Sequence, residues 1–471
     1  MAFVAACGSS SGSSTCDPAA QTGCGSGQVC EVVQNGSPAC FAPVLVRGSA
    51  ADSTTAVLLN DARVVALDSN RAPVSTVQVT ANDGTANGAY VLKLARATRA
   101  DATGRPAQAS ITLRADKQGY QTFPSGIRMA LPIDLSGATP SSGSWVVSGP
   151  LTALKLAPVS SSLTATAFIH GSVAAAPSGA GTLIVAEPSP GGAGPQTGFT
   201  GVADDAGNYA IYNLNPGTQY VVTAYTKGAN YAPVTTAALV AGDNAVSILT
   251  RGSGTGATLT GGLIFNNGAS SSIEATLVVQ STYVPTLDRG ETPPGLTVAV
   301  GASGYSFSGV PDGKYVVLAP FGLTGDVRDV SGGGNTAAPN VTIASGAVVG
   351  TPPSFKIIPA VDLLTIGGTS VGANPVTVTT ATPTFAWQKQ NVDSSAATYR
   401  VLVFDSFGNP TWSNDMAANT TDSIPYGGTA LQAGMTYQLR ILAIKEAMPV
   451  SASFTQLSQT EDVRGVFTFQ P

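Results

Sequence analysis

The most constraining feature of this sequence is a pattern that occurs twice, 96 residues apart. A tyrosine opens an alternating segment, a turn with proline and glycine follows, and a Tyr-Val-Val segment comes next. The first copy runs from Tyr209 to Val222 and the second from Tyr305 to Val317. Alternation predicts strands with one buried face, and Pro and Gly suit tight turns. Each copy therefore predicts two strands and a turn within a repeated β domain.

Each copy is preceded by a strand-like segment that ends near a glycine. These segments are Ala167–Gly171 and Ala257–Gly261. A third occurs earlier at Val46–Gly48, and the strand around Tyr90 is the equivalent of the tyrosine strands in the other two copies. The sequence therefore predicts three related units in a row.

Composition supports an all-β chain. Gly and Pro are abundant, with 54 and 31 residues, and charged residues make up only 10%. An average soluble protein has about 25% charged residues. Glycine and proline shape turns, and no window shows a sustained apolar period of 3.6 residues, so we expect short strands joined by many turns.

The glycine-ended opening strand, the Gly-x-Tyr strand and the turn before Tyr-x-Val resemble the carboxypeptidase regulatory-like domain, a transthyretin-like β-sandwich. The resemblance covers three copies, at residues 42–158, 159–251 and 252–357. The first copy departs from the pattern, because a polar insertion from Arg96 to Gln108 replaces the turn after Tyr90. In that family this domain is an accessory one without catalytic residues, so the resemblance implies no carboxypeptidase activity.

Residues 358–471 have a different pattern. Trp387 follows Phe385 in a strand-like segment, Tyr399–Asp405 alternates, and Leu431–Tyr437 has the form Leu-x-x-Gly-x-x-Tyr. These features resemble a fibronectin type III domain. The resemblance implies that Trp387 is buried and that the Tyr437 hydroxyl returns to nearby backbone while its ring fills the core.

All five cysteines lie in the first 40 residues. Val4-Ala5-Ala6-Cys7 resembles the lipobox of bacterial lipoproteins, which implies cleavage before Cys7 and a diacylglycerol on its sulfur. We expect residues 1–6 to be the remnant of a signal peptide that begins upstream, and residues 7–15 to be a lipid-anchored flexible tether. This resemblance implies an extracytoplasmic location, at the outer membrane or cell surface, and a membrane as a partner.

The other four cysteines, Cys16, Cys24, Cys30 and Cys40, bracket a short segment that we treat as a module of residues 16–41. Zinc sites usually contain Cys-x2-4-Cys pairs, and the gaps here are longer. Two disulfides fit better, because so short a segment cannot bury a sufficient core without covalent help. Four cysteines allow three pairings, and the sequence does not choose among them.

Charge excludes some classes of partner. The net charge is −5 and the pI is about 4.9, so there is no basic footprint for nucleic acid. No uninterrupted apolar stretch reaches the roughly 18 residues typical of a spanning helix.

Catalytic residues are scarce. His170 is the single histidine, and it lies in a predicted strand. No Gly-x-Ser-x-Gly elbow is present, and one histidine cannot form the usual metal site. Asp204–Asn208 lacks the spacing of an EF-hand loop and is interpreted as a hairpin turn. We therefore expect no enzyme activity, no catalytic residue, no metal and no cofactor.

Two tryptophans are candidates for ligand contact. Trp145 and Trp412 lie in loop-like sequence, and exposed aromatic rings can stack on the apolar face of a sugar. Packing at a strand edge is the alternative interpretation for both.

The main hypothesis is a non-enzymatic surface lipoprotein of a Gram-negative-type bacterium, in which stacked sandwiches extend a binding end away from the membrane. Its partner would be a polysaccharide or another surface protein, and lightly charged strand edges offer one way to associate. The alternative is a carbohydrate-binding protein, since transthyretin-like sandwiches are similar in fold to starch-binding modules. A remote alternative is a hydrolase with an unrecognised site.

Overall fold

In a computed structural model of the chain, the described residues form strands, and three short 3-10 turns lie among them: η1 (Leu135–Gly137), η2 (Pro150–Thr152) and η3 (Gln280–Thr282). The described residues are 16–18, 21–68, 73–84, 87–94, 97–124, 132–159, 166–174, 181–189, 198–204, 206–265, 274–284, 290–300, 304–319, 325–329, 340–352, 354–372, 374–389, 395–419 and 421–471. Within them, no helix has the length and apolar composition needed to cross a bilayer. The predicted fold class, tandem β-sandwiches behind a disulfide-stapled segment, is confirmed.

The N-terminal module is a two-stranded sheet of β1 (Val29–Glu31) and β2 (Ala39–Phe41). Disulfides join Cys16 to Cys30 and Cys24 to Cys40, so the two bridges interlace. Cys30 and Cys40 face each other in the ladder, which brings both bridges together at one place.

The first sandwich contains two sheets. One sheet consists of β3 (Leu45–Asp52), β6 (Ala89–Lys93), β9 (Thr139–Ser141), β10 (Ser144–Val147) and β11 (Ala153–Leu156). The other consists of β4 (Arg63–Leu67), β5 (Gln78–Val79), β7 (Ser110–Asp116) and β8 (Ile133–Asp134).

The second and third sandwiches follow the same plan. The second has β12 (Ala167–Ser172), β15 (Asn208–Leu214) and β19 (Gly242–Ala245) against β13 (Leu183–Ser189), β14 (Phe199–Val202), β16 (Gln219–Thr226), β17 (Ala229–Asn230) and β18 (Val234–Thr235). The third has β20 (Ala257–Phe265), β23 (Gly304–Val310), β25 (Asp326–Arg328) and β28 (Phe355–Pro359) against β21 (Glu274–Val279), β22 (Thr297–Ala299), β24 (Gly313–Leu318), β26 (Asn340–Ala344) and β27 (Ala347–Val349).

The last sandwich has a four-stranded and a six-stranded sheet. The smaller one contains β29 (Asp362–Ile366), β30 (Thr369–Ser370), β32 (Thr384–Gln388) and β35 (Thr421–Pro425). The larger one contains β31 (Val376–Val378), β33 (Thr398–Asp405), β34 (Pro410–Ala417), β36 (Thr436–Ile444), β37 (Gln456–Gln459) and β38 (Val466–Phe469).

A glycine and a tyrosine face each other in each of the first three sandwiches. Gly261 on β20 pairs with Tyr305 on β23, and a Cβ atom on that glycine would lie 2.1 Å from the tyrosine hydroxyl oxygen. The same pairing joins Gly171 to Tyr209. In the first sandwich the pair is Gly48 with Tyr90. The tyrosine ring lies across the glycine, and this contact explains why the two motifs recur together.

Alternation along β13 places neighbouring residues in different cores. Ile184 belongs to the core of the second sandwich, whereas Leu183 and Val185 join that of the third. Side chains of a strand point to opposite faces, so a strand buried on both faces links two cores. The second and third sandwiches are therefore packed face to face.

Arg114 joins three sandwiches at one buried point. It extends from β7 of the first, and its guanidinium pairs with Asp116 at 2.8 Å. It also pairs with Glu291 of the third at 3.0 Å and donates to the Thr200 carbonyl of the second at 3.2 Å. Arg114 is 2% exposed, so these bonds are shielded from water and hold the three sandwiches in one arrangement.

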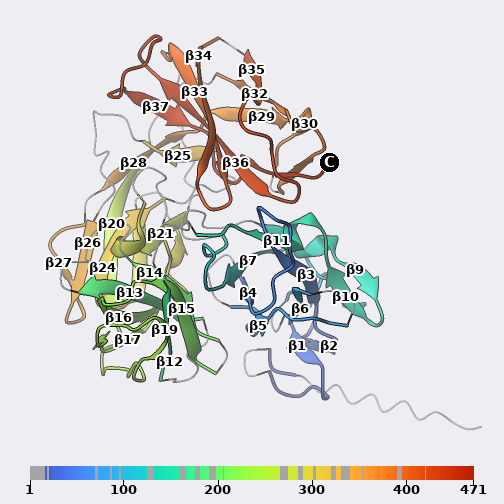
Figure 1. Cartoon of the computed structure of the whole chain (residues 1–471), viewed down its shortest axis with the longest axis vertical. Coiled ribbons are helices and arrows are strands. Elements are labelled where there is room, and N and C mark those ends of the chain that lie inside the picture. The colour runs from blue at the N-terminus through green and yellow to red at the C-terminus, as the bar shows by residue number, and fades with distance from the viewer. Residues whose placement is uncertain are drawn as a thin grey trace, which may run out of the picture.

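The last sandwich packs back against the first. Phe123 and Phe407 meet edge to face with their ring centroids 5.7 Å apart, and the two sandwiches share one hydrophobic core. Figure 1 shows this sandwich (orange and red) directly above the first (blue to cyan), so the four sandwiches do not follow one another in single file. The expectation of an extended stack is therefore wrong, because buried apolar side chains join the last sandwich to the first.

The polar insertion in the first sandwich binds the N-terminal module. Arg99 forms an ion pair with Glu31, and both side chains are fully buried. The Ala97 amide donates to the same carboxylate at 2.8 Å, and Arg99 also donates to the Ala42 carbonyl at 2.8 Å. Burial raises the pKa of Glu31, and Arg99 and the Ala97 amide oppose that shift. The departure from the repeat pattern is thus the docking element for the module.

Candidate functional site

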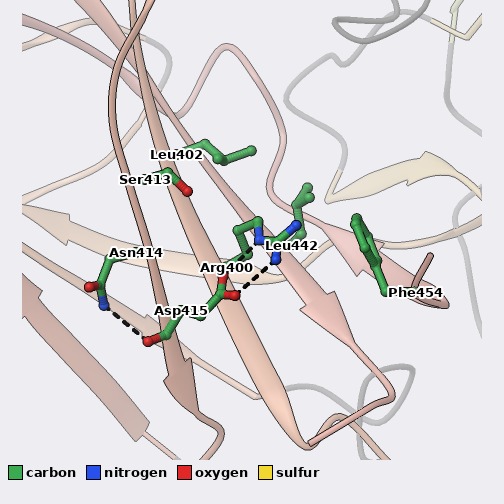
Figure 2. A pocket seen from close by; sticks show the side chains of 7 residues that line it. All are labelled: Arg400, Leu402, Ser413, Asn414, Asp415, Leu442 and Phe454. Carbon is green, nitrogen blue, oxygen red and sulfur yellow. Dashed lines mark hydrogen bonds and ion pairs between the residues drawn. The ribbon is translucent and has the colours of Figure 1, made fainter. Parts of the chain in front are cut away.

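A hollow of about 470 Å³ lies on the outer face of the larger sheet of the last sandwich. Seven residues line it, as Figure 2 shows: Arg400, Leu402, Ser413, Asn414, Asp415, Leu442 and Phe454. They come from β33, β34, β36 and the segment before β37. Its size falls within the range typical of small-molecule sites, about 300–1,000 Å³.

Strand register brings these side chains together. Arg400 on β33 is opposite Asp415 on β34 and Leu442 on β36, and Leu402 is opposite Ser413. The intervening residues of β33, such as Val401, are fully buried in the core. Period-two alternation therefore places one face of these strands in the core and the other in the hollow.

Arg400 and Asp415 form a two-pronged ion pair. Nε of Arg400 donates to Oδ1 of Asp415 at 2.7 Å, and Nη2 donates to Oδ2 at 2.8 Å. These hydrogen bonds raise the pKa of Arg400 above its usual value, so it stays charged. The guanidinium carbon also lies over the Phe454 ring, 4.9 Å from its centre, which is a cation–π contact.

The segment that carries Phe454 is tied down at its base. The Thr455 amide donates to the Glu446 carboxylate at 2.9 Å, and the Lys445 amide donates to the Thr455 carbonyl at 3.0 Å. The first of these bonds lowers the pKa of Glu446. Thr455, the residue that follows Phe454, is therefore held by hydrogen bonds through both its amide and its carbonyl.

A second hollow of about 260 Å³ lies between the first and last sandwiches. Its lining is mostly polar and includes Gln121, Asp405 and Tyr426. Asp405 already accepts from the amides of Phe407 and Asn409, each at 2.9 Å. The Asn409 side chain donates to the same carboxylate at 2.8 Å, so Asp405 is used within its own turn and has fewer acceptor positions left than Asp415 in the outer hollow.

Both candidate tryptophans lie in strands rather than in loops. Trp412 is on β34 opposite Val403, which places it on the core side of the sheet. It is partly buried, and its ring meets Tyr426 edge to face at 5.3 Å. Trp145 is on β10 and packs against the same core. Neither lines the two hollows, and ligand contact by either stays a prediction.

The two core features expected in the last sandwich are present. Trp387 is fully buried, with Tyr399 edge to face at 5.5 Å. The Tyr437 hydroxyl accepts a hydrogen bond from the Gln432 amide at 2.7 Å, and its side chain is buried. The corner that the sequence predicted is therefore formed.

Sequence reasoning missed the ion pair in the hollow. Arg400 interrupts an otherwise apolar alternating strand, which was a signal for an outward position. Its partner Asp415 lies on the next strand, and Phe454 follows two further strands, β35 and β36. The three side chains therefore meet only through strand register, which no local sequence pattern indicates.

The predictions for Cys7 and for the other four cysteines stand differently. Cys7 lies outside the described residues, so lipidation stays a prediction. The sulfur atoms of Cys16, Cys24 and Cys40 lie within 4.8 Å of one another, a spacing that thiolate ligands of a metal also have. Here they belong to disulfides, which leaves no thiolate to bind zinc.

The remaining polar candidates have structural roles in the described chain. His170 is about half exposed on β12, and its Nδ1 lies 2.6 Å from Oδ1 of Asp243. Asp204 accepts from the amides of Ala206 and Asn208, so this segment is a turn. It connects β14 to β15, which belong to different sheets, so the turn does not join the two strands of a hairpin as predicted.

Comparison with known proteins identifies an immunoglobulin-type domain in the last sandwich. Residues 369–458 match the family described as Rha78A-like, N-terminal immunoglobulin domain. The match covers a minority of the chain, and the finer fibronectin and carboxypeptidase regulatory-like assignments stay predictions. No curated protein matches the chain.

Several solved structures match parts of the chain at low similarity. A shaft pilin SpaA from Lactobacillus rhamnosus GG is 11% identical, covering 44% of this chain and 96% of the pilin, with a TM-score of 0.17. A DUF3823 family protein from Parabacteroides merdae is 11% identical, covering 45% and 98%, with a TM-score of 0.19. A candidate carbohydrate-binding protein from Bacteroides uniformis is 12% identical, covering 64% and 99%, with a TM-score of 0.15. Similarity at this level carries no functional argument.

Proposed function

We propose that this chain is a non-enzymatic, lipid-anchored protein of a bacterial outer membrane or cell surface, which presents binding surfaces on a rigid assembly of sandwiches. The observation that carries the proposal is the buried Arg114 cluster, which joins three sandwiches through Asp116, Glu291 and Thr200. Breaking such a cluster leaves a buried charge without a partner, so the sandwiches resist separation. A scaffold needs this property.

Two further observations support an extracytoplasmic location. The interlaced disulfides, Cys16–Cys30 and Cys24–Cys40, are characteristic of oxidising compartments. The sequence Val4-Ala5-Ala6-Cys7 supplies an acceptor for lipid nine residues before the first disulfide cysteine. A cysteine that carries a diacylglycerol has two acyl chains, which suffice for stable attachment without a membrane-spanning segment.

The compact arrangement of the sandwiches differs from the extended stalk that the sequence suggested for presenting a binding surface. Because the last sandwich contacts the first, it belongs to one compact body rather than to the tip of a single-file stalk, and Figure 1 shows it at the end of that body opposite β1 and β2. We expect a broad rigid head on a short flexible tether.

The anchor is tested by expressing the gene with its upstream coding sequence and comparing it with Cys7→Ser. We expect metabolic palmitate labelling and membrane fractionation of the parent, and loss of both in the variant. Equal labelling of the two proteins would rule out Cys7 as the lipid acceptor.

A second candidate function is carbohydrate binding. The observation that favours it is the outer hollow, which combines an arginine–aspartate pair with apolar side chains. Binding of the whole chain to an array of cell-wall and storage glycans tests this function. A blank array would eliminate it and leave the anchor proposal standing.

A further inference from the structure

Resting on the carbohydrate-binding proposal, we propose that the outer hollow binds an uncharged sugar unit through the Arg400–Asp415 pair. Trp412 lies on the opposite face of β34 from Asp415, and it is not among the residues that line this hollow.

Charge balance selects for a neutral ligand. Arg400 is the one cation and Asp415 the one anion among the residues that line the hollow. They lie in direct contact, and their side chains are 21% and 26% exposed. An anionic ligand near the arginine would also meet the aspartate, and a cationic ligand would meet the arginine. An uncharged ligand is repelled by neither Asp415 nor Arg400.

Hydrogen-bonding capacity matches hydroxyl groups. A guanidinium has five N–H donors, and Asp415 takes two of those on Arg400. A carboxylate has about four acceptor positions, and Arg400 occupies two. The pair therefore offers donors and acceptors side by side. Adjacent sugar hydroxyls both donate and accept, so they can bond to both partners at once.

The apolar part of the hollow matches the C–H face of a sugar ring. Leu402 and Leu442 lie beside the ion pair, and Phe454 stands on the far side of Arg400 (Figure 2). Because Arg400 is held between Asp415 and the Phe454 ring, little side-chain freedom is lost on binding. The site is thus organised before a ligand arrives.

The first test uses the full chain and an array that contains neutral and acidic glycans. We expect a neutral glycan to be retained, with at least tenfold weaker binding by Arg400→Gln and by Phe454→Ala. Arg105→Gln is the matched control, because Arg105 forms an exposed pair with Asp101 in the first sandwich. Unchanged thermal melting shows that each variant is folded. A folded Arg400→Gln protein that binds as tightly as the parent would overturn the proposal.

Asp415→Asn gives a second and more specific test. It keeps the size of the side chain but leaves the Arg400 charge unbalanced, so we expect a shift toward glycans with carboxylate groups. A variant that still binds only neutral glycans would refute the charge-balance argument. A blank array for the parent chain would reject this site together with the carbohydrate proposal, whereas the Cys7 labelling result would be unaffected.

Discussion

At the residue scale, the repeat is explained by one contact made three times. The opening-strand glycine has no side chain, so the tyrosine of the paired strand lies across it, as with Gly261 and Tyr305. Glycine weakens a strand because it offers no side chain to pack, and an aromatic residue on the facing strand covers the gap. Glycine and tyrosine must therefore change together.

Gly261→Ala tests this contact. The added methyl group would lie 2.1 Å from the Tyr305 hydroxyl oxygen, so the ring or strand must shift. We expect destabilisation of about 1–3 kcal/mol, as for other overpacked sites. Gly372→Ala is the control, since its Cβ would meet open space, and it should be neutral or slightly stabilising. Denaturant unfolding measures both; equal stability of the two variants would contradict the account.

The Tyr437 corner predicts sensitivity to alkali. Burial raises the pKa of Tyr437 to about 12 in the folded chain, whereas an unfolded tyrosine titrates near pH 10. The unfolded chain then loses its proton first, so this contribution to stability is intact below about pH 10 and declines as the pH rises toward 12. Tyr437→Phe should flatten the fall in melting temperature over that interval. An identical slope in both proteins would argue against it.

At the element scale, the insertion before β7 contacts the N-terminal disulfide module. Residues 97–108 carry Arg99 to the buried Glu31 of the disulfide module, and the Arg99 guanidinium lies 5.0 Å from the Phe41 ring centre. Disulfides close the module, but this ion pair attaches it to the first sandwich. The attachment therefore depends on charge compensation in a buried setting.

Arg99→Met should detach or destabilise the module. Removing one partner of a buried pair leaves an uncompensated charge, and we expect a loss of about 3–5 kcal/mol. Combining it with Glu31→Gln should recover part of that loss. Arg105→Met removes an exposed pair and should change stability by less than about 1 kcal/mol. Melting curves and limited proteolysis of the module distinguish these outcomes; equal effects of the two arginine variants would disprove the role of burial.

The strands and the repeat were predictable because alternation and turn residues are local signals. The glycine and tyrosine motifs located the three units, and Tyr437 located the corner. The hollow was not predictable, because Arg400, Asp415 and Phe454 meet only through the register of separate strands. The assignment of Trp412 to a loop was wrong because Pro410 and Asn414 usually form turns. Here Pro410 begins an edge strand, β34, and Asn414 lies within it.

At the scale of the whole molecule, contacts between sandwiches decide the shape. Arg114 joins the first three, and the Phe123–Phe407 contact returns the last to the first. These contacts join residues distant in sequence, which is why a chain of four units suggested a line rather than a closed assembly. Rigidity follows, because moving one sandwich would expose apolar rings or separate buried charges.

Small-angle X-ray scattering tests this arrangement. A single compact body of this length has a radius of gyration of about 23 Å, and a linear stack would be much more extended. We expect the parent chain to lie near the compact value, because the last sandwich is held by a shared core. Arg114→Met combined with Phe123→Ala removes both kinds of link and should increase the radius, whereas Arg105→Met should leave it unchanged. A parent chain as extended as the double variant would mean that the sandwiches separate in solution, and the rigid-scaffold proposal would fail with it.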